Sequence, residues 1–239
     1  MKILDLTFSS AADNLSCDEA LLDRSEASDG AEVLRFWEPK EHFVVLGYSN
    51  AWKEETLPPV KKAGLAPVFR RCSGGGTVLQ GPGCLNYSLV LKIDEEGASR
   101  NIRATNEYVM QRHRAALEKL LGEKVAVQGH TDLTLDGLKF SGNSQRRKRK
   151  YLLFHGTFLL DFDLPRLDRV LAIPQKQPAY RQNRPHSAFV TNLQVPAADI
   201  KKALAETWKA RGTVEDVPRE DIERLSKERY SRDEWNLKF

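Results

Sequence analysis

The 239-residue sequence lacks features that would each place it in a particular class of protein. Its three cysteines, Cys17, Cys72 and Cys84, are an odd number and form no Cys-x-x-Cys pair, so neither a disulfide framework nor a zinc site is indicated. No apolar run approaches the roughly 18 residues of a membrane span, and residues 1–5 do not begin the long apolar segment of a signal peptide. We therefore expect a cytoplasmic protein without a membrane partner.

A glycine loop beside two arginines is the first candidate site. Residues 70–79 read Arg-Arg-Cys-Ser-Gly-Gly-Gly-Thr-Val-Leu, which is neither the Gly-x-x-x-x-Gly-Lys-Ser/Thr loop of common nucleotide hydrolases nor the Gly-x-Gly-x-x-Gly of dinucleotide binders. Because glycine lacks a Cβ, such a loop can turn its amide N–H groups toward an anion, and the arginines add charge-assisted hydrogen bonds. The loop predicts a phosphate site, although a glycine cluster by itself usually marks a turn.

A lysine just past a predicted hairpin is the second candidate. Asp136-Gly137 lies between two short apolar segments, which is a strong signal for a two-residue β-hairpin. Lys139 opens the segment Lys-Phe-Ser-Gly-Asn-Ser directly after this turn. On its own it would be interpreted as an exposed strand lysine, so its meaning depends on the motifs around it.

The chain as a whole indicates mixed α and β structure in one domain. Alternating apolar and polar residues predict a half-buried strand over 85–93, and helical spacing with Gly122 as the stop predicts a helix over 101–121. Further strands are expected over 32–37, 42–48, 66–71 and 151–164, and further helices over 53–63, 165–173, 197–209 and 219–229. Pro58 and Pro59 interrupt the first of these helices.

In this order and spacing, the motifs resemble those of the lipoate-protein ligase group of the biotin/lipoate ligase superfamily. The segments that carry the resemblance are 14–19, 44–50, the glycine loop, 83–88, 131–133, 139–144, 155–160 and 190–193. The resemblance extends over nearly the whole chain. It implies an α/β (α+β) fold, a biotin/lipoate ligase-like catalytic domain of mixed, largely antiparallel sheets packed with helices.

The resemblance also implies the chemistry. Family members use ATP to convert lipoate to lipoyl-AMP and pyrophosphate, and a lysine amine of an acceptor protein then takes the lipoyl group. Attack of a carboxylate on a phosphate brings two anions together, so fixed cations and N–H donors must offset the repulsion. The expected cofactors are ATP and Mg²⁺, with lipoate as substrate. The expected acceptors are acidic lipoyl domains, such as those of 2-oxoacid dehydrogenases and the glycine cleavage H protein.

Carried over residue by residue, the resemblance assigns the site. Lys139 is expected to be catalytic, in contact with both the lipoyl carbonyl and the α-phosphate. Asp132 is expected to hold Mg²⁺ or to orient Lys139, with a solvated turn aspartate as the alternative. The residues expected to bind the nucleotide or lipoyl-AMP are Arg71, Ser73, Gly74, Gly75, Gly76, Thr77, Val78, Leu79, Asn86, Lys139, Ser141, Gly142, His155 and Gly156. Candidates for the apolar lining are Phe36, Trp37, Leu46 and Tyr48, while Arg70 is interpreted as a structural neighbour.

Three alternatives stay open. A transferase of the same fold would form a cysteine thioester with an octanoyl or lipoyl group. The cysteine of one transferase type is replaced by Leu152, and no cysteine lies between Cys84 and Lys139, so Cys72 is the thiol nearest the expected site. A biotin ligase would carry a Gly-Arg-Gly-Arg-x-Gly-Arg segment, which is missing. A non-catalytic module that binds carrier domains is the third alternative.

Five consecutive cations occupy residues 146–150 of a chain whose net charge is +4. We interpret this basic run as a solvated loop, with contact to an acidic protein partner near the site mouth as the alternative. No aromatic residues are interleaved with it, so nucleic acid is not the expected partner.

The chain ends at Phe239, where two-domain ligases of the family continue into a small accessory domain. We therefore expect one catalytic domain over 1–239 without that accessory domain. Short forms of this kind either act alone or work with a separately encoded accessory subunit, which is an expected partner.

Overall fold

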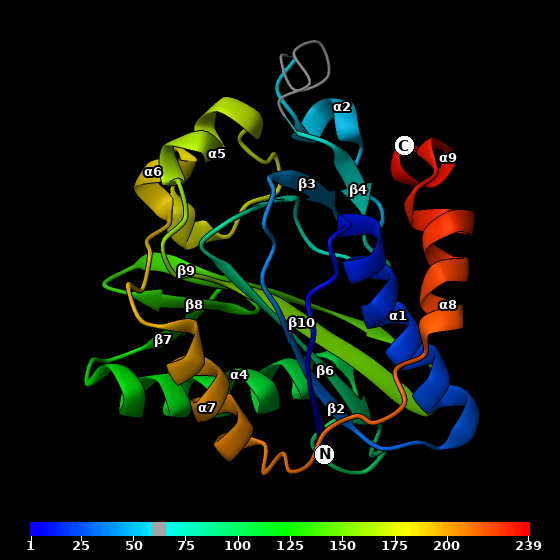
Figure 1. Ribbon diagram of the computed structural model, residues 1–239. Coiled ribbons are helices and arrows are strands. Elements are labelled where there is room, and N and C mark those ends of the chain that lie inside the picture. Colours follow the sequence, from blue (N-terminus) through cyan, green and yellow to red (C-terminus); the bar gives the residue numbers. More distant parts are fainter. Residues whose placement is uncertain (59–65) are drawn as a thin grey trace.

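The computed structural model describes residues 1–58 and 66–239, and a seven-stranded sheet forms its centre (Figure 1). The strand order is β1-β2-β6-β10-β9-β8-β7, in which β1 and β2 are parallel and the other neighbours are antiparallel. These strands are β1 (Lys2–Asp5), β2 (Val33–Trp37), β6 (Cys84–Lys92), β7 (Ala126–Gln128), β8 (Asp132–Leu135), β9 (Leu138–Arg147) and β10 (Tyr151–Leu159). A smaller sheet has the order β4-β3-β5, with β3 (Phe43–Leu46), β4 (Val68–Arg70) and β5 (Val78–Gln80).

Helices cover both faces of the large sheet. The long helix α4 (Ile102–Leu121) and α7 (Ala197–Thr207) pack on one face, and α1 (Ala11–Ser28) and α8 (Arg219–Leu225) lie together on the other (Figure 1). The remaining helices are short: α2 (Trp52–Glu55), α5 (Leu164–Val170), α6 (His186–Phe189) and α9 (Asp233–Asn236), with a 3₁₀ turn, Ala179–Arg181, and a π turn, Ser226–Tyr230. This arrangement confirms the predicted fold class.

The strand predicted over 85–93 exists as β6, but the prediction that it is half-buried was wrong. Every residue from Cys84 to Leu91 is buried. The alternation separates two buried faces: Leu85, Tyr87, Leu89 and Leu91 pack in the core beneath α4 and α7, whereas Val90 packs on the side of α1. The polar residues of β6 therefore face α1 or an internal cavity, and not bulk water.

Several local predictions are confirmed. Asn101 caps α4 by accepting the Ala104 N–H at 2.8 Å, and Gly122 ends the helix with φ 68°. The turn between β8 and β9 has φ 48° at Asp136 and 77° at Gly137, as a two-residue hairpin requires. The strand predicted over 151–164 ends at Leu159, because α5 begins at Leu164 with a proline in its first turn. The helix predicted over 53–63 is present only as α2, which ends at Glu55; residues 56–58 are not helical, and residues 59–63 lie outside the described residues.

The basic run at 146–150 was predicted to be a solvated loop. Residues 146 and 147 instead end β9, whereas 148–150 form the turn into β10, in which Arg149 and Lys150 are exposed. Arg147 donates to a hydroxyl of α4 at 3.0 Å and to a backbone carbonyl at 2.8 Å. Lys148 Nζ pairs with Asp23 at 2.6 Å, and the Glu26 carboxylate accepts the Lys150 N–H at 3.0 Å. Both acidic residues belong to α1, so the ammonium group of Lys148 and the backbone of the turn hold the sheet to that helix.

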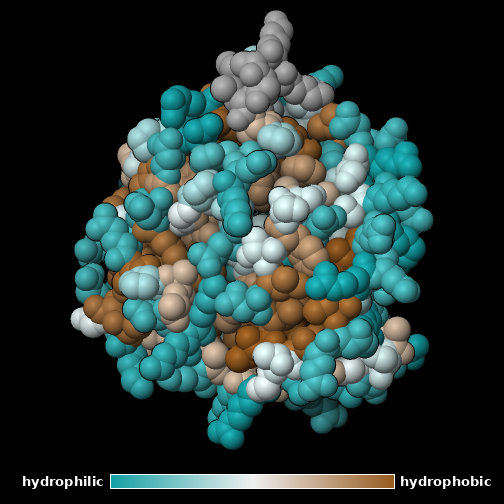
Figure 2. All heavy atoms as spheres, viewed as in Figure 1, coloured by the Kyte–Doolittle hydropathy of each residue, from teal (hydrophilic) through white to brown (hydrophobic). Residues whose placement is uncertain are grey.

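Hydrophilic side chains cover most of the face seen in Figure 2, and apolar side chains gather in its lower centre. Within the described residues, no helix combines the length and the apolar character needed to cross a membrane.

Candidate active site

One cavity of about 1800 Å³ brings together the residues that the sequence predicted. It is lined by Arg71, Gly74, Gly75, Gly76, Thr77, Val78, Leu79, Asn86, Asp132, Lys139, Ser141, Gly142, His155 and Gly156. Of the residues predicted to bind the nucleotide or lipoyl-AMP, Ser73 alone does not line it, and its side chain is fully buried. Residues far apart in the sequence therefore share one site.

Two rows of cross-strand neighbours run beneath the cavity, and all of their members except Ser88 and Arg35 line its floor. Paired residues in antiparallel strands direct their side chains to the same face of the sheet. The first row is Gly142, Thr157, Asn86 and Trp37, and the second is Ser144, His155, Ser88 and Arg35. In the next row along the strands, Leu153, Val90 and Val33 are apolar and pack with α1, and Arg146 is the fourth member. The sheet thus changes from a helix-covered core to an open polar floor along the same strands.

A β-bulge places Lys139 on this floor. In the pairing of β8 with β9, Leu133 faces Ser141 but Thr134 faces Lys139, so Phe140 is an extra residue. Such an insertion reverses the alternation of side chains and re-aims its neighbours. Lys139 consequently shares a face with Gly142 and Asp132 instead of with Ser141, and its Nζ lies 2.8 Å from Asp132 Oδ1.

Gly142 makes room for the lysine. A Cβ at this position would lie 2.7 Å from Lys139 Nζ and 2.8 Å from its Cε. Any larger residue would therefore push the ammonium group off the floor. Gly142 follows Lys139 by three residues, and the bulge brings the two together on one face.

Asp132 orients Lys139. Its second oxygen, Oδ2, accepts the Tyr180 hydroxyl at 2.7 Å, and burial, followed by the charge of Asp132, raises the pKa of that hydroxyl well above its usual value. Both oxygens of Asp132 are thus engaged, and within the described residues no three His, Cys, Asp or Glu side chains come together as a metal site. The metal role of Asp132 stays a prediction.

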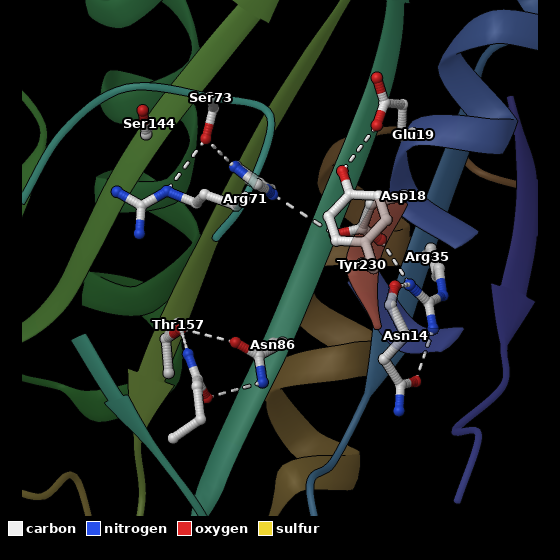
Figure 3. A network of polar contacts seen from close by, with 12 residues as sticks. Asn14, Asp18, Glu19, Arg35, Arg71, Ser73, Asn86, Ser144, Thr157 and Tyr230 are labelled. Atoms are coloured by element: carbon white, nitrogen blue, oxygen red, sulfur yellow. Dashed lines mark hydrogen bonds and ion pairs between the residues drawn. The ribbon is translucent and has the colours of Figure 1, made fainter. Parts of the chain in front are cut away.

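The glycine loop is braced from inside by Arg71. Its Nη2 donates to Gly74 O at 2.6 Å and to Gly76 O at 2.8 Å, and its Nε donates to Ser73 Oγ at 3.0 Å (Figure 3). Burial lowers the pKa of Arg71 to about 10, so the group remains charged at neutral pH. Ser144 Oγ also donates to Gly74 O, at 2.9 Å. The arginine fixes the shape of the loop and ties it to the floor of the cavity.

His155 connects the loop to a buried ion pair. Its Nε2 lies 2.6 Å from Ser73 Oγ and its Nδ1 lies 3.3 Å from Asp18 Oδ2. Asp18 in turn pairs with Arg35 at 2.5 Å, and both side chains are almost fully buried. Burial, the largest single cause, raises the pKa of the Asp18 carboxyl, but the charge of Arg35 and the hydrogen bonds with His155 and Ser88 together outweigh it, so the pKa lies below its usual value. His155 is thus a positioning residue at the cavity wall as well as a lining residue.

Asn86 belongs to a closed triangle of hydrogen bonds. Its Nδ2 donates to Gln80 Oε1 at 3.0 Å, Gln80 Nε2 donates to Thr157 Oγ1 at 2.7 Å, and Thr157 Oγ1 donates to Asn86 Oδ1 at 2.6 Å. Figure 3 shows Asn86 and Thr157 turned toward each other from adjacent strands. All three residues line the cavity, so the triangle forms a rigid polar wall.

The three cysteines are unsuited to nucleophilic attack. Cys17, Cys72 and Cys84 are all buried, and burial is the main cause that raises the pKa of each thiol to about 12. The thiolate is the reactive form, so at neutral pH these groups are inert. Cys72 follows Arg71 in sequence but packs in the core beneath α1.

The apolar lining was only partly predicted. Trp37 lines the cavity, whereas Phe36 and Leu46 are core residues and Tyr48 packs outside it against Trp235. The sequence pattern did not distinguish these positions because burial in a core and burial in a pocket leave the same apolar signature. The interpretation of Arg70 as a structural residue fits its fully buried guanidinium, whose hydrogen bonds go to backbone carbonyls.

The sequence analysis missed three lining residues, Asp18, Gln80 and Thr157. It also missed Tyr180, which reaches the site through its hydrogen bond to Asp132. Asp18 and Thr157 lie inside motifs that carry the family resemblance, so a signal was present for them. Gln80 and Tyr180 stand outside those motifs, and no local pattern marks them.

Residues 10–209 match the family model of the lipoyl protein ligase A/B catalytic domain. The chain belongs to this family. The predicted family, and with it the predicted class of ligase enzyme, are confirmed.

The chain resembles both lipoate-protein ligases and octanoyltransferases. It is 29% identical to lipoate-protein ligase A subunit 1 of Thermoplasma acidophilum, over 94% of this chain and 91% of the relative. It is also 27% identical to the octanoyltransferase LipM of Carboxydothermus hydrogenoformans, over 100% of this chain and 98% of the relative. Sequence similarity alone therefore does not separate ligase from transferase.

Solved structures of the family share the fold. One describes a bi-partite lipoate protein ligase and its E2 lipoyl domain from Thermoplasma acidophilum, with a TM-score of 0.84 and 24% identity over 99% of this chain and 95% of that one. Another is a lipoate-protein ligase A bound with ATP, with a TM-score of 0.81 and 25% identity over 99% of this chain and 98% of that one.

Proposed function

We propose that this chain activates lipoate with ATP to form lipoyl-AMP and pyrophosphate, and then transfers the lipoyl group to a lysine amine of a lipoyl domain. The observation that carries the proposal is the position of Lys139. Its ammonium group is held over Gly142 by Asp132 and lines the same cavity as the glycine loop. The similarity to a ligase structure bound with ATP supports the nucleotide.

In the first half-reaction, a carboxylate oxygen of lipoate attacks the α-phosphorus of ATP. The bond from that phosphorus to the bridging oxygen breaks, and pyrophosphate leaves. Lys139 supplies a fixed positive charge between the two anions, and Asp132 keeps it in place without reorganisation. The loop, shaped by Arg71, provides the opposite wall.

In the second half-reaction, a neutral lysine amine of the acceptor attacks the acyl carbonyl. An amide bond forms, the bond to the phosphate oxygen breaks, AMP leaves, and the amine loses a proton. Lys139 stabilises the negative charge that develops on the carbonyl oxygen, as a single preorganised donor commonly does. One cation thus serves both steps.

The acceptor and the accessory subunit are also part of the proposal. The Thermoplasma acidophilum relative is named as a subunit, and its structure is described as a bi-partite ligase with an E2 lipoyl domain. By analogy, we propose that this chain acts on lipoyl domains and is completed by a separate accessory subunit. Mg²⁺ is expected to arrive with ATP, and no step is assigned to it here.

The similarity to an octanoyltransferase makes cysteine-dependent acyl transfer the second candidate function. The three thiols are buried and their pKa values are raised, which argues against that function. One experiment separates the two. The purified chain is incubated with lipoate, ATP and Mg²⁺, with and without a lipoyl domain, and pyrophosphate, lipoyl-AMP and lipoylated domain are measured. Adenylate formation without acceptor is the expected result. Acyl transfer from a carrier protein without ATP, together with an acyl thioester on a cysteine, would overturn the ligase proposal.

A further inference from the structure

Arg181 is a buried cation that the described structure leaves without a counter-ion. It ends the 3₁₀ turn Ala179–Arg181, its side chain is 4% exposed, and it lines the active-site cavity. Its Nε donates to Arg184 O at 3.1 Å. Its Nη2 has no hydrogen-bond partner within residues 1–58 and 66–239, and no ion pair of Arg181 is found there.

The nearby carboxylates are already engaged. Asp132 binds Lys139 and Tyr180, and Asp168 accepts the backbone N–H of His186 at 2.8 Å and that of Ser187 at 3.2 Å. Neither hydrogen-bonds to Arg181. An unpaired charge in such surroundings is costly, so an external anion is the natural partner.

The backbone around Arg181 is fixed to the hairpin that carries Lys139. Tyr180 donates to Asp132, and Arg184 donates to Tyr180 O at 2.9 Å and to Gly137 O at 3.3 Å. The guanidinium carbon of Arg181 lies 4.8 Å from the centre of the Phe189 ring, which holds its plane. The guanidinium group of Arg181 is therefore preorganised near Lys139. Burial, the largest cause, lowers the pKa of His186, and the charges of Arg181 and Lys139 lower it further, which places both cations near one side chain.

We propose that Arg181 is an anion-binding residue of the active site, and that its guanidinium takes an oxygen of a reacting group, either a phosphate of ATP or the carboxylate of the acid. A planar guanidinium matches both groups, and it binds them through charge-assisted hydrogen bonds. The inference rests on the proposed function for the identity of the ligand. Arg181 is then a second cation of the active site, on the side formed by residues 174–181, and it acts with Lys139.

The test uses Arg181→Met, which keeps the length and removes the charge, and Arg181→Lys, which keeps the charge and removes the fork. Arg169→Met is the matched control, because Arg169 is an exposed arginine of α5 paired with Asp163 at the surface. ATP, lipoate and pyrophosphate are titrated separately into each protein by calorimetry, and the midpoint of thermal unfolding is recorded.

We expect Arg181→Met to weaken the binding of one substrate roughly tenfold or more, the scale of a lost hydrogen bond to a charged group. Loss of ATP affinity identifies the phosphate as the ligand, and loss of lipoate affinity identifies the carboxylate. Arg181→Lys should lose less, and Arg169→Met should match the wild type. The unfolding midpoint should not fall, since an unpaired buried charge is removed.

Unchanged affinities for ATP and lipoate in Arg181→Met, with or without a lower unfolding midpoint, would overturn the inference and leave the proposed function intact. If the wild type binds neither ATP nor lipoate but binds pyrophosphate in a manner that depends on Arg181, the anion site stands and the proposed function fails. Binding of none of the three ligands by the wild type would overturn both.

Discussion

Lys139 and Asp132 meet because Phe140 is one residue more than the β8–β9 pairing needs. The extra residue turns Lys139 to the face where Gly142 leaves space. The backbone therefore determines where the ammonium group lies. Catalysis by electrostatic preorganisation requires this kind of placement.

We predict that Lys139→Ala lowers the rate of lipoyl-AMP formation on the order of 10²–10³-fold, because one preorganised charge between two anions is lost. Pyrophosphate release measures the rate. Lys150→Ala, at the far end of the same strand pair, serves as the control and should retain the wild-type rate. An Ala variant at 139 with nearly normal release would show that the lysine is a surface residue.

A second prediction concerns the thiols. Replacing Cys17, Cys72 and Cys84 together by Ala should leave ATP-dependent ligation largely in place, since all three are buried and none needs to act as a nucleophile. The variant will be less stable, because small cavities remain in the core. Activity is therefore measured well below its unfolding midpoint. Loss of ligation by folded variant protein would restore the thioester alternative.

At this scale the sequence predicted most of the residues that line the cavity, because they occur in motifs with ordered spacing. It did not predict how they interact. Arg71 was expected to touch the nucleotide but donates to loop carbonyls, and Asn86 binds two side chains. Such contacts depend on the register between strands, which a one-dimensional pattern does not contain.

At the scale of the elements, a buried hydrogen bond joins α4 to the residue that follows α7. Trp208, directly after α7, donates its indole N–H to His113 Nε2 of α4 at 2.9 Å. Burial lowers the pKa of His113 to about 3. Protonation would add a proton to the nitrogen that accepts this bond, so the neutral ring is a structural requirement for the contact.

We predict that this histidine makes stability depend on pH. Its folded pKa lies below the usual value of about 6.5, so the unfolded chain binds the proton first. The contribution is fully present above about pH 6.5 and is lost as the pH falls toward 3, by at most about 1.4 kcal/mol per pH unit. His113→Gln keeps an acceptor for Trp208 but does not titrate, and should flatten the slope.

Chemical denaturation at pH 7, 5.5 and 4.5 measures the effect, with His130→Gln as the control because His130 is exposed. His42 and His186, whose pKa values burial also lowers, will leave a residual slope. Equal slopes in wild type and His113→Gln would contradict the assignment.

Element boundaries followed the sequence best where local chemistry decides them. The capped helix α4 and the Asp-Gly hairpin are examples, since a side-chain cap and a positive φ act within a few residues. The basic run was misjudged because its partners, Asp23 and Glu26, lie more than a hundred residues earlier. Charge density alone does not report such partners.

At the scale of the whole molecule, the last helix supports the glycine loop. The Arg70 guanidinium donates to carbonyls of Gly47 and Tyr48 and to those of Trp235 and Asn236. Asn236 Oδ1 accepts the Arg70 N–H at 2.9 Å. Arg70, which precedes Arg71, is thereby held between the segment after β3 and helix α9.

We predict that Asn236→Ala raises the KM for ATP more than it lowers kcat, and lowers the unfolding midpoint by a few degrees. A buried N–H is left unpaired, which costs about 1–3 kcal/mol, and 1 kcal/mol corresponds to roughly 2–4 °C in a chain of this size. Asn236→Asp retains the acceptor and should recover part of both effects. A normal KM in a destabilised Ala variant would limit the clamp to a structural role.

The overall architecture was predictable because family motifs are spread over nearly the whole chain, and the structural neighbours share it. The prediction of a single catalytic domain without an accessory domain stays a prediction. The contact of the basic run with an acceptor also stays a prediction. Roughly 26 Å of extended backbone separates Arg147 from Lys139, but Gln145 lines the cavity, so the near end of the run lies beside it.

The burial of the thiols also bears on the survival of the enzyme beside its proposed substrate. Lipoate carries a cyclic disulfide, and an accessible thiolate would open that ring and form a mixed disulfide. Cys72 adjoins the loop in sequence, yet its thiol is withdrawn into the core with a pKa of about 12. The exchange reaction needs the thiolate, so the protein handles a redox-active ligand without being trapped by it.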